Sequence, residues 1–220
     1  TPLTTTTYTL SANNAVGTVS QSIIITVSGS ASGQTQTGQG YYVFNLLPAE
    51  SGSLIKNMTT YIQYGAVCAG DTMANLASRA FLSFDISSIP AQAVVEEAVL
   101  DLGGYTIIGN PSYTSSNWGN MGALEVYSYQ YGVFASLGRL GYEATAPLAG
   151  SLRIDEITGA PMKIDVTNDS SGSNIIQKLL AERQGRCQFR VQFFTSTNWN
   201  SLTDMICMEN AVLRVKYRVP

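Results

Sequence analysis

The chain has 220 residues with a formal net charge of −3, from 12 basic and 15 acidic residues, and it contains no histidine. The missing histidine excludes Ser-His-Asp and Cys-His catalytic constellations and the familiar histidine-containing metal sites, and the scattered charges leave no basic face for a nucleic acid. No apolar run is long enough for a membrane span, and the low charged fraction of 12 %, with abundant Thr, Ser and Tyr, is typical of a β-rich protein that is secreted, extracellular or on the cell surface.

Residues 1–29 are predicted to form a β-hairpin. Thr4–Val27 contains two β-prone runs on either side of a turn at Asn14–Gly17, and it resembles the last two strands of a bacterial immunoglobulin-like domain. Because an isolated two-stranded hairpin is only marginally stable in water, we expect it to gain strands from sequence upstream, from the rest of the chain, or from another subunit as a strand-exchange arm. The positions expected to take part in strand exchange are Tyr8, Leu10, Ile23, Ile25 and Val27.

A polar segment follows the hairpin. Ser28–Gly40 is rich in Gly, Ser, Thr and Gln, a composition typical of a flexible linker, so we place a linker at 30–40 and a second domain at 41–220. That domain is predicted to be all-β, a jelly-roll-like antiparallel β-sandwich with one short helix at Ser173–Arg183. Its strands are expected at Tyr41–Leu46, Thr59–Tyr64, Arg79–Ile86, Val94–Leu102, Ala123–Tyr129, Lys163–Val166, Cys187–Phe194 and Ala211–Arg218.

The run Arg79–Leu102 has the clearest strand pattern in the chain. Apolar and polar residues alternate in two segments around a turn at Pro90, which places one face of each strand on a core and the other toward water. Asp85 is expected to organise the turn after the first strand by accepting backbone hydrogen bonds. The inward positions are Leu82, Phe84, Ile86, Ala98, Leu100 and Leu102, and the outward positions are Ser83, Asp85, Glu97 and Asp101.

The same run carries a family resemblance. Its pattern R-x-x-L-x-F-D-I-S-S-I-P-x-x-A-x-V-x-x-A-x-L-x-L is similar to that of DNRLRE, or disaggregatase-related, domains, and the likeness covers roughly residues 40–220. It implies a secreted jelly-roll β-sandwich of the kind attached to surface proteins and polysaccharide-active enzymes. The likeness continues at Asp165–Thr167 and in a closing strand with Ala211, Leu213, Val215 and Tyr217.

Cysteine pairing stays open at this point. Cys187 lies on the apolar face of its predicted strand, and if Met205–Tyr217 is one continuous strand, Cys207 points inward as well. Cys187 and Cys207 are therefore candidates for a disulfide, with two buried free thiols as the alternative. Cys68 is left over, and we expect it to be buried rather than linked to another chain.

The acidic residues do not form a recognisable site. The adjacent pairs Glu96–Glu97 and Asp155–Glu156 point to opposite faces of a strand, which does not suit a glycosidase, and we expect neither enzymatic activity nor a cofactor. Asp71, Asp204 and Glu209 lie beside loops and could supply oxygen ligands to calcium. No loop has a calcium-binding spacing, however, and solvated loop carboxylates are the favoured interpretation, so no metal site is predicted.

Two polar loops each present aromatic rings among amides. Sugars are often held in this way, because a ring contacts the C–H face and amides bind hydroxyls, but Trp also anchors loops and subunit interfaces, so all three roles stay open. The residues are Tyr113, Asn117 and Trp118 in one loop and Asn198, Trp199 and Asn200 in the other. Tyr127, Tyr129 and Tyr131 form either an exposed aromatic row or a face covered by a loop or a neighbour.

Two functions fit these predictions. In the preferred one, the protein is a non-enzymatic structural subunit of an extracellular assembly, such as a filament, sheath or virion decoration, and strand addition joins it to copies of itself or to a neighbouring surface protein. In the alternative, it is a carbohydrate-binding or adhesive module of a larger secreted or cell-surface protein, with a polysaccharide as ligand. The tethered hairpin favours the first, and the family resemblance favours the second.

Overall fold

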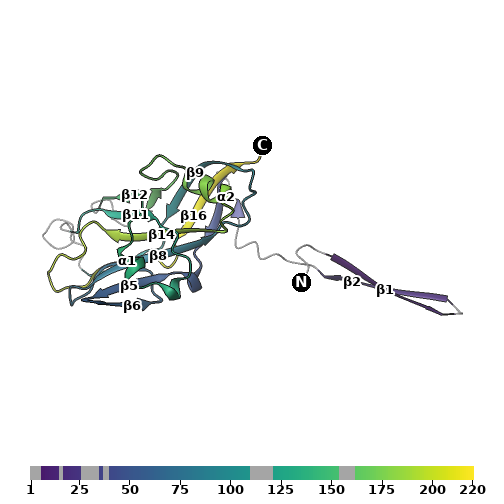
Figure 1. Cartoon of the computed structure of the whole chain (residues 1–220), viewed down its shortest axis with the longest axis horizontal. Coiled ribbons are helices and arrows are strands. Elements are labelled where there is room, and N and C mark those ends of the chain that lie inside the picture. Colours follow the sequence, from purple (N-terminus) through teal and green to yellow (C-terminus); the bar gives the residue numbers. More distant parts are fainter. Residues whose placement is uncertain (1–5, 15–16, 26–34, 37–39, 110–120, 154–161) are drawn as a thin grey trace. The chain divides into compact units, whose positions relative to one another are not determined.

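The computed structural model describes residues 6–14, 17–25, 35–36, 40–109, 121–153 and 162–220 (Figure 1). The chain divides into two compact units, residues 1–33 and 34–220. In the first unit, β1 (Thr6–Asn14) and β2 (Gly17–Ile25) form an antiparallel hairpin in which Thr6 lies opposite Ile25. The predicted N-terminal hairpin is confirmed.

The second unit is a sandwich of two antiparallel sheets, which confirms the predicted all-β class. The larger sheet follows the order β10-β15-β7-β8-β14-β11-β12, and β5 and β6 join it through β8. Its strands are β5 (Gly52–Asn57), β6 (Thr60–Tyr64), β7 (Cys68–Asp71), β8 (Ala77–Asp85), β10 (Thr106–Ile108), β11 (Leu124–Ser128), β12 (Leu148–Leu152), β14 (Arg186–Phe193) and β15 (Asp204–Cys207). The smaller sheet has the order β13-β9-β16-β4-β3 and contains β3 (Thr35–Gln36), β4 (Tyr42–Asn45), β9 (Val94–Asp101), β13 (Lys163–Asp165) and β16 (Val212–Arg218).

All eight strands predicted for the sandwich are present, but the described residues contain further strands that the sequence pattern does not indicate, namely β3, β5, β7, β10, β12 and β15. β7 and β15 are buried on both faces and therefore lack an alternating pattern. β3 lies inside the segment 30–40 expected to be a linker, and it pairs with β4. The ordered sandwich thus reaches further toward the N-terminus than residue 41.

The predicted helix is present as α2 (Ile175–Ala181). Asn174 caps it by accepting a 2.9 Å hydrogen bond from the Gln177 N–H, and the predicted aliphatic face is buried. The expectation of a single helix is wrong, because a second short helix, α1 (Arg139–Glu143), precedes β12. α1 has only five residues and contains a glycine, so its formation depends on packing of the buried Tyr142.

The main core lies between the two sheets, and the predicted inward positions are confirmed. The six residues have 0 % exposure: Leu82, Phe84, Ile86, Ala98, Leu100 and Leu102. The expectation that the other faces meet water is wrong at two positions. Ser83 and Asp101 are buried. Ser83 lies under the segment before β5 and donates a hydrogen bond to Glu50. Asp101 packs against Arg214, and the Arg214 Nε lies 2.8 Å from the Asp101 Oδ2.

A second apolar cluster covers the outer face of the larger sheet. It consists of Leu54, Phe81, Tyr131, Phe134 and Tyr142, with Tyr129 packed against it. The chain between β11 and β12 therefore folds back over β8, where the Tyr131 ring meets the Phe81 ring edge-on at 5.4 Å. Of the two alternatives for Tyr127, Tyr129 and Tyr131, the structure therefore shows a sheet face that a loop covers and not an exposed aromatic row.

The predicted pairing of Cys187 with Cys207 is wrong. The disulfide joins Cys68 and Cys207, which lie directly opposite each other in the β7–β15 ladder, and Cys187 is a free, buried thiol whose pKa burial raises. The parity argument failed because Met205–Tyr217 is not one strand: the chain turns after Cys207, where the Ala211 N–H donates to the Met208 carbonyl, and continues in the other sheet as β16. Cys207 therefore lies outside the main core, in a small cluster with Ile55 and Met205.

Replacing both Cys68 and Cys207 by Ala is expected to lower the free energy of unfolding by about 3–5 kcal/mol, because the bond closes a loop with a sequence separation of 139 residues. Urea denaturation of the oxidised protein measures the loss. Cys187→Ala is the matched control and should cost only about 1 kcal/mol, the effect of a small buried truncation. Peptide mapping without reductant that linked Cys187 to Cys207 would contradict the assignment.

Candidate functional site

The loop between β14 and β15 carries one of the predicted aromatic triplets, and two buried acids hold its base. Asp71 Oδ2 accepts a 2.5 Å hydrogen bond from Thr197 Oγ1 and a 3.2 Å bond from the Asn198 backbone N–H. Asp204 Oδ2 accepts 2.8 Å bonds from the side-chain amides of Asn198 and Asn200. β7 and β15 present these acids side by side, so the end of the larger sheet is the anchor of the loop.

Trp199 stands at the tip of this loop with 76 % of its surface exposed. Trp199 and Ser201 both have a φ of 59°, a left-handed conformation that few non-glycine residues adopt without support. The support comes from side chains such as Asn75, whose Oδ1 accepts the Ser201 N–H at 3.0 Å. The side-chain amides of Asn198 and Asn200 donate hydrogen bonds to Asp204 and accept hydrogen bonds from backbone N–H groups of the loop. Within the predicted triplet, the Trp199 ring is the group presented outward.

The three acids considered as calcium ligands, Asp71, Asp204 and Glu209, do not lie together. Asp71 and Asp204 are fully buried, so the favoured interpretation of solvated carboxylates is wrong for them. Burial raises the pKa of Asp71 and the charge of Asp204 acts in the same direction, whereas the hydrogen bonds from the loop oppose the rise. Glu209 is exposed and lies beside the Cys68–Cys207 disulfide, at the opposite end of the β7–β15 ladder.

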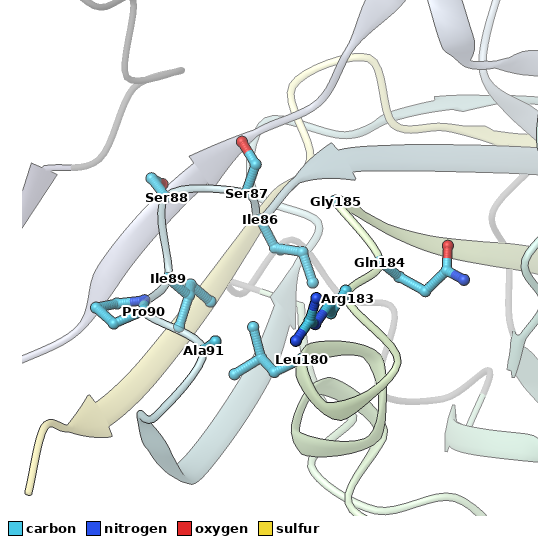
Figure 2. Close-up of a pocket in the computed structure, with 10 residues that line it drawn as sticks. All are labelled: Ile86, Ser87, Ser88, Ile89, Pro90, Ala91, Leu180, Arg183, Gln184 and Gly185. Carbon is cyan, nitrogen blue, oxygen red and sulfur yellow. The ribbon is translucent and has the colours of Figure 1, made fainter. Parts of the chain in front are cut away.

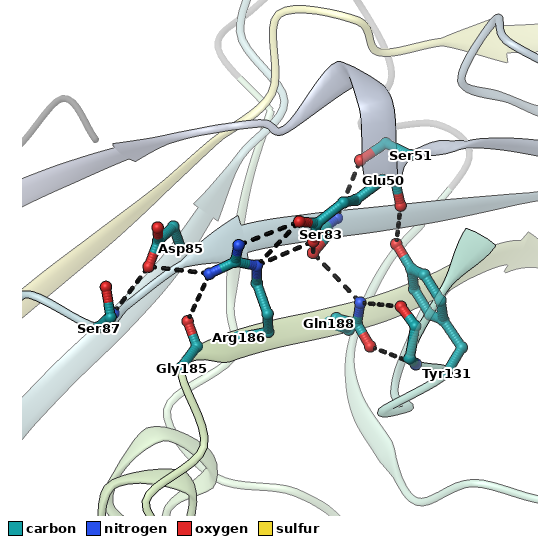
Figure 3. Close-up of polar contacts among 10 residues, drawn as sticks. Glu50, Ser51, Ser83, Asp85, Ser87, Tyr131, Gly185, Arg186 and Gln188 are labelled. Carbon is teal, nitrogen blue, oxygen red and sulfur yellow. Dashed lines mark hydrogen bonds and ion pairs between the residues drawn. The ribbon is translucent and has the colours of Figure 1, made fainter. Parts of the chain in front are cut away.

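A second polar cluster ties the turn before β5 to β8 and β14 (Figure 3). The Glu50 carboxylate accepts hydrogen bonds from Arg186 Nε at 2.9 Å, Arg186 Nη2 at 3.0 Å and Ser83 Oγ at 2.8 Å. Arg186 Nη1 also lies 3.1 Å from Asp85 Oδ1, which accepts the Ser87 N–H at 3.0 Å as predicted for this turn. The Arg186 hydrogen bonds lower the pKa of Glu50. These contacts connect the turn before β5 to β8 and β14.

Two clefts open on either side of Gln184. The first, of about 350 Å³, lies between the turn after β8 and the end of α2, where Ile86, Ile89 and Leu180 meet Arg183 (Figure 2). The second, of about 760 Å³, lies beside the Glu50–Arg186 pair. The lining of the first contains hydroxyls and no acid, and the lining of the second contains acids and neither hydroxyl nor thiol. The acids of the second lining are Glu182 and Glu50, and Glu50 is held by Arg186 and Ser83.

Charged groups on the outer face of the larger sheet also contact other residues of the same chain. Arg190 is buried, its guanidinium lies 5.0 Å from the centre of the Tyr127 ring, and burial lowers its pKa to about 10. Burial and a hydrogen bond to Glu125 raise the pKa of Tyr127 to about 12. Glu143 of α1 accepts bonds from Tyr61, Lys56 and Arg139, which lower its pKa to about 2. These contacts fasten the covering segment to the sheet.

The remaining predicted contact residues belong to the other aromatic loop and to the hairpin. Tyr113, Asn117 and Trp118 lie outside the described residues, as does Val27. The hairpin register places Tyr8 opposite Ile23. Because opposite and alternate positions share a face, the strand-exchange positions Tyr8, Leu10, Ile23 and Ile25 fall on one face of the hairpin.

The Glu50–Arg186 cluster is the feature that sequence reasoning missed. Its partners are 136 residues apart and belong to no motif. The available signal is weak: charged residues make up only 12 % of the chain, so an arginine at the start of a strand such as β14 suggests an internal partner without naming it.

Comparisons with known proteins were made for the whole chain. A scan against protein-family models finds no match, and a search of curated proteins finds no similar sequence. In the part of the chain that the structure describes, no helix has the length and apolar character needed to cross a membrane. The resemblance to DNRLRE domains stays a prediction.

Glu50→Gln is expected to lower the free energy of unfolding at pH 7 by about 1–2 kcal/mol, because Arg186 loses a charged partner in a half-exposed site. The pKa of folded Glu50 lies below its ordinary value of 4.5, so this contribution is fully present above that pH and is lost as the pH falls through the lowered pKa. Urea denaturation at pH 7 and pH 3 should show the gap between the two proteins shrinking at the lower pH. An equal gap at both values would mean that Glu50 acts through packing alone.

Proposed function

We propose that the protein is a non-enzymatic structural subunit of an extracellular assembly, joined to its neighbours by strand addition through the N-terminal hairpin. The observation that supports this proposal is the hairpin itself. Within the described residues, β1 and β2 pair along nine positions with each other and with no other strand. Two paired strands rarely persist alone in water, so a third strand from a neighbour would complete a sheet.

The composition of the hairpin suits this role. Residues 6–25 contain no charged residue and no proline, the two devices with which proteins usually protect a sheet edge from unwanted pairing. Main-chain hydrogen bonds then supply the contact without special side chains. An unprotected edge of this kind is expected where pairing with another chain is the purpose.

The sandwich offers an edge of matching character in β6. Among the described strands β6 pairs only with β5, four of its five residues are exposed, and it too has neither charge nor proline. Addition of one subunit's hairpin to the β6 edge of the next would be a head-to-tail contact, and repetition of such a contact builds a polymer. The disulfide is compatible with an extracellular location, where such bonds persist.

The full chain is expected to form oligomers or polymers in solution, whereas a chain that begins at Gln34 should stay monomeric. This boundary leaves the compact sandwich unit and β3 intact. Light scattering after size-exclusion chromatography gives both masses. Two monomers of intact fold would contradict the proposal.

Proline variants of the hairpin test strand pairing without removing the N-terminal segment. Neighbouring N–H groups of a strand point to opposite edges. Of the variants Thr9→Pro and Leu10→Pro, one therefore removes a hydrogen-bond donor on the outer edge of β1, and the other removes a hydrogen bond between β1 and β2. Both variants should reduce assembly. Trp199→Ala is the matched control and should assemble normally.

A carbohydrate-binding module is the second candidate, and the exposed Trp199 ring on a braced loop supports it. If the protein binds polysaccharide, Trp199→Ala should weaken retention on insoluble polysaccharides about 5- to 30-fold, since stacking on an aromatic ring contributes about 1–2 kcal/mol. Pull-down with cellulose, chitin and peptidoglycan measures this, with the exposed Tyr64→Ala as control. Equal retention of both variants would remove Trp199 from any glycan site.

A further inference from the structure

The acid pair Asp71 and Asp204 beneath the Trp199 loop has no role in the proposed assembly. The two residues are directly opposite in the β7–β15 ladder, so their side chains leave the same face of the sheet about 5 Å apart. The next pair on that face, Ala69 and Ile206, belongs to the main core. Both acids have 0 % exposure, and two carboxylates are thus enclosed at the end of an apolar interior.

Of the four carboxylate oxygens in this pair, only half have hydrogen-bond partners among the described residues. The Oδ2 atoms of Asp71 and Asp204 receive four hydrogen bonds from the loop. The two Oδ1 atoms are buried and have no hydrogen-bond partner in the part of the chain that the structure describes. Among the described residues, neither acid forms an ion pair with Lys or Arg. Buried carboxylate oxygens without a partner are rare and costly.

The electrostatics of the pair favour a bound cation. Donors from the loop stabilise the ionised form of both carboxylates, while two neighbouring anions repel and burial opposes their charge. One proton shared between the acids would relieve the repulsion, but it would leave a net negative charge in the interior. A divalent cation neutralises both acids, and both Oδ1 atoms can then act as its ligands.

The atoms that could act as ligands beside the pair are carboxylate and carbonyl oxygens, which selects the kind of cation. The Thr203 carbonyl and Asp204 Oδ1 both lie against the Cα of Gly109, where any Cβ would collide with them. Gly109 has a φ of 111°, which favours glycine, and the absence of a side chain there lets its backbone pack close to Asp204 Oδ1. Hard cations prefer carboxylate and carbonyl oxygens, and Ca²⁺ accepts the irregular geometry of such a set.

We infer that Asp71 and Asp204 bind a hard divalent cation, best matched by Ca²⁺, through their Oδ1 atoms, and that this cation fixes the base of the Trp199 loop. The coupling to the loop follows from the shared carboxylates, because the same groups hold Thr197, Asn198 and Asn200 through Oδ2. Water and backbone oxygens would complete the coordination. This site is independent of the proposed assembly.

Calorimetric titration of the full chain, stripped with a chelator, tests the inference. CaCl₂ should bind at one site with a Kd on the order of 10⁻⁴–10⁻³ M, the range of extracellular calcium modules, and millimolar Ca²⁺ should raise the melting temperature. MgCl₂ should bind at least tenfold more weakly, because Mg²⁺ demands near-ideal octahedral geometry. No heat and no shift in melting temperature at millimolar Ca²⁺ would overturn the inference, and melting that instead rises as the pH is lowered would identify a shared proton.

Variants locate the site. Asp71→Asn with Asp204→Asn keeps the shape of both side chains and should abolish Ca²⁺ binding, and without calcium it should melt no lower than the stripped parent, since the repulsion is gone. Glu209→Gln, which changes an exposed acid at the other end of the ladder, should bind as the parent does. Binding that survives in the double variant, or is lost in Glu209→Gln, would place the cation elsewhere.

A lanthanide measurement covers the case in which the double variant does not fold. Tb³⁺ replaces Ca²⁺ at oxygen sites and luminesces when a nearby tryptophan is excited. Trp199→Phe leaves both carboxylates in place and should lose most of this luminescence while keeping the heat of Ca²⁺ binding. Luminescence equal to that of the parent would show that the ion lies away from the loop.

Discussion

Burial of β8 on both faces is the constraint on which the rest of the sandwich depends. Leu82 and Phe84 fill the space between the sheets, while Phe81 on the opposite face lies under the chain between β11 and β12. A strand covered in this way leaves its polar side chains without water. Ser83 therefore finds its partners inside the protein, donating to Glu50 and accepting from the Gln188 amide. The Glu50–Arg186 cluster, which connects the turn before β5 to β14, follows from that requirement.

Internal use of polar groups shapes what the protein presents outside. Glu50, Glu143 and Arg190 are each occupied by several partners within the chain, and the amides of Asn198 and Asn200 brace their own loop. Among the described residues, the exposed surface includes the β6 edge and the Trp199 ring. The proposed assembly rests on the β6 edge and the hairpin, and the alternative glycan contact rests on the Trp199 ring.

The short β7–β15 ladder is closed at its two ends by different chemistry. At one end Cys68 and Cys207 are joined covalently on the outer face, and at the other Asp71 and Asp204 meet on the inner face. Four-residue strands contribute few ladder hydrogen bonds of their own, so both ends need such support. A cation between the acids would do electrostatically what the disulfide does covalently, and it would connect the stability of the sheet to the position of Trp199.

The sequence by itself determined the elements whose pattern is local. Alternation in Arg79–Leu102 gave the inward positions, the aliphatic stripe gave α2, and the turn at Asn14–Gly17 gave the hairpin, because the period of two or 3.6 residues is set by backbone geometry alone. Only the tertiary structure decided which distant residues meet. Cys68 with Cys207, Glu50 with Arg186 and Asp71 with Asp204 lie far apart in the chain, and each pairing depends on strand order and register across the sheet. Those are fixed by how the two sheets and the covering segment pack, and a shift of one residue would turn every one of these side chains to the other face.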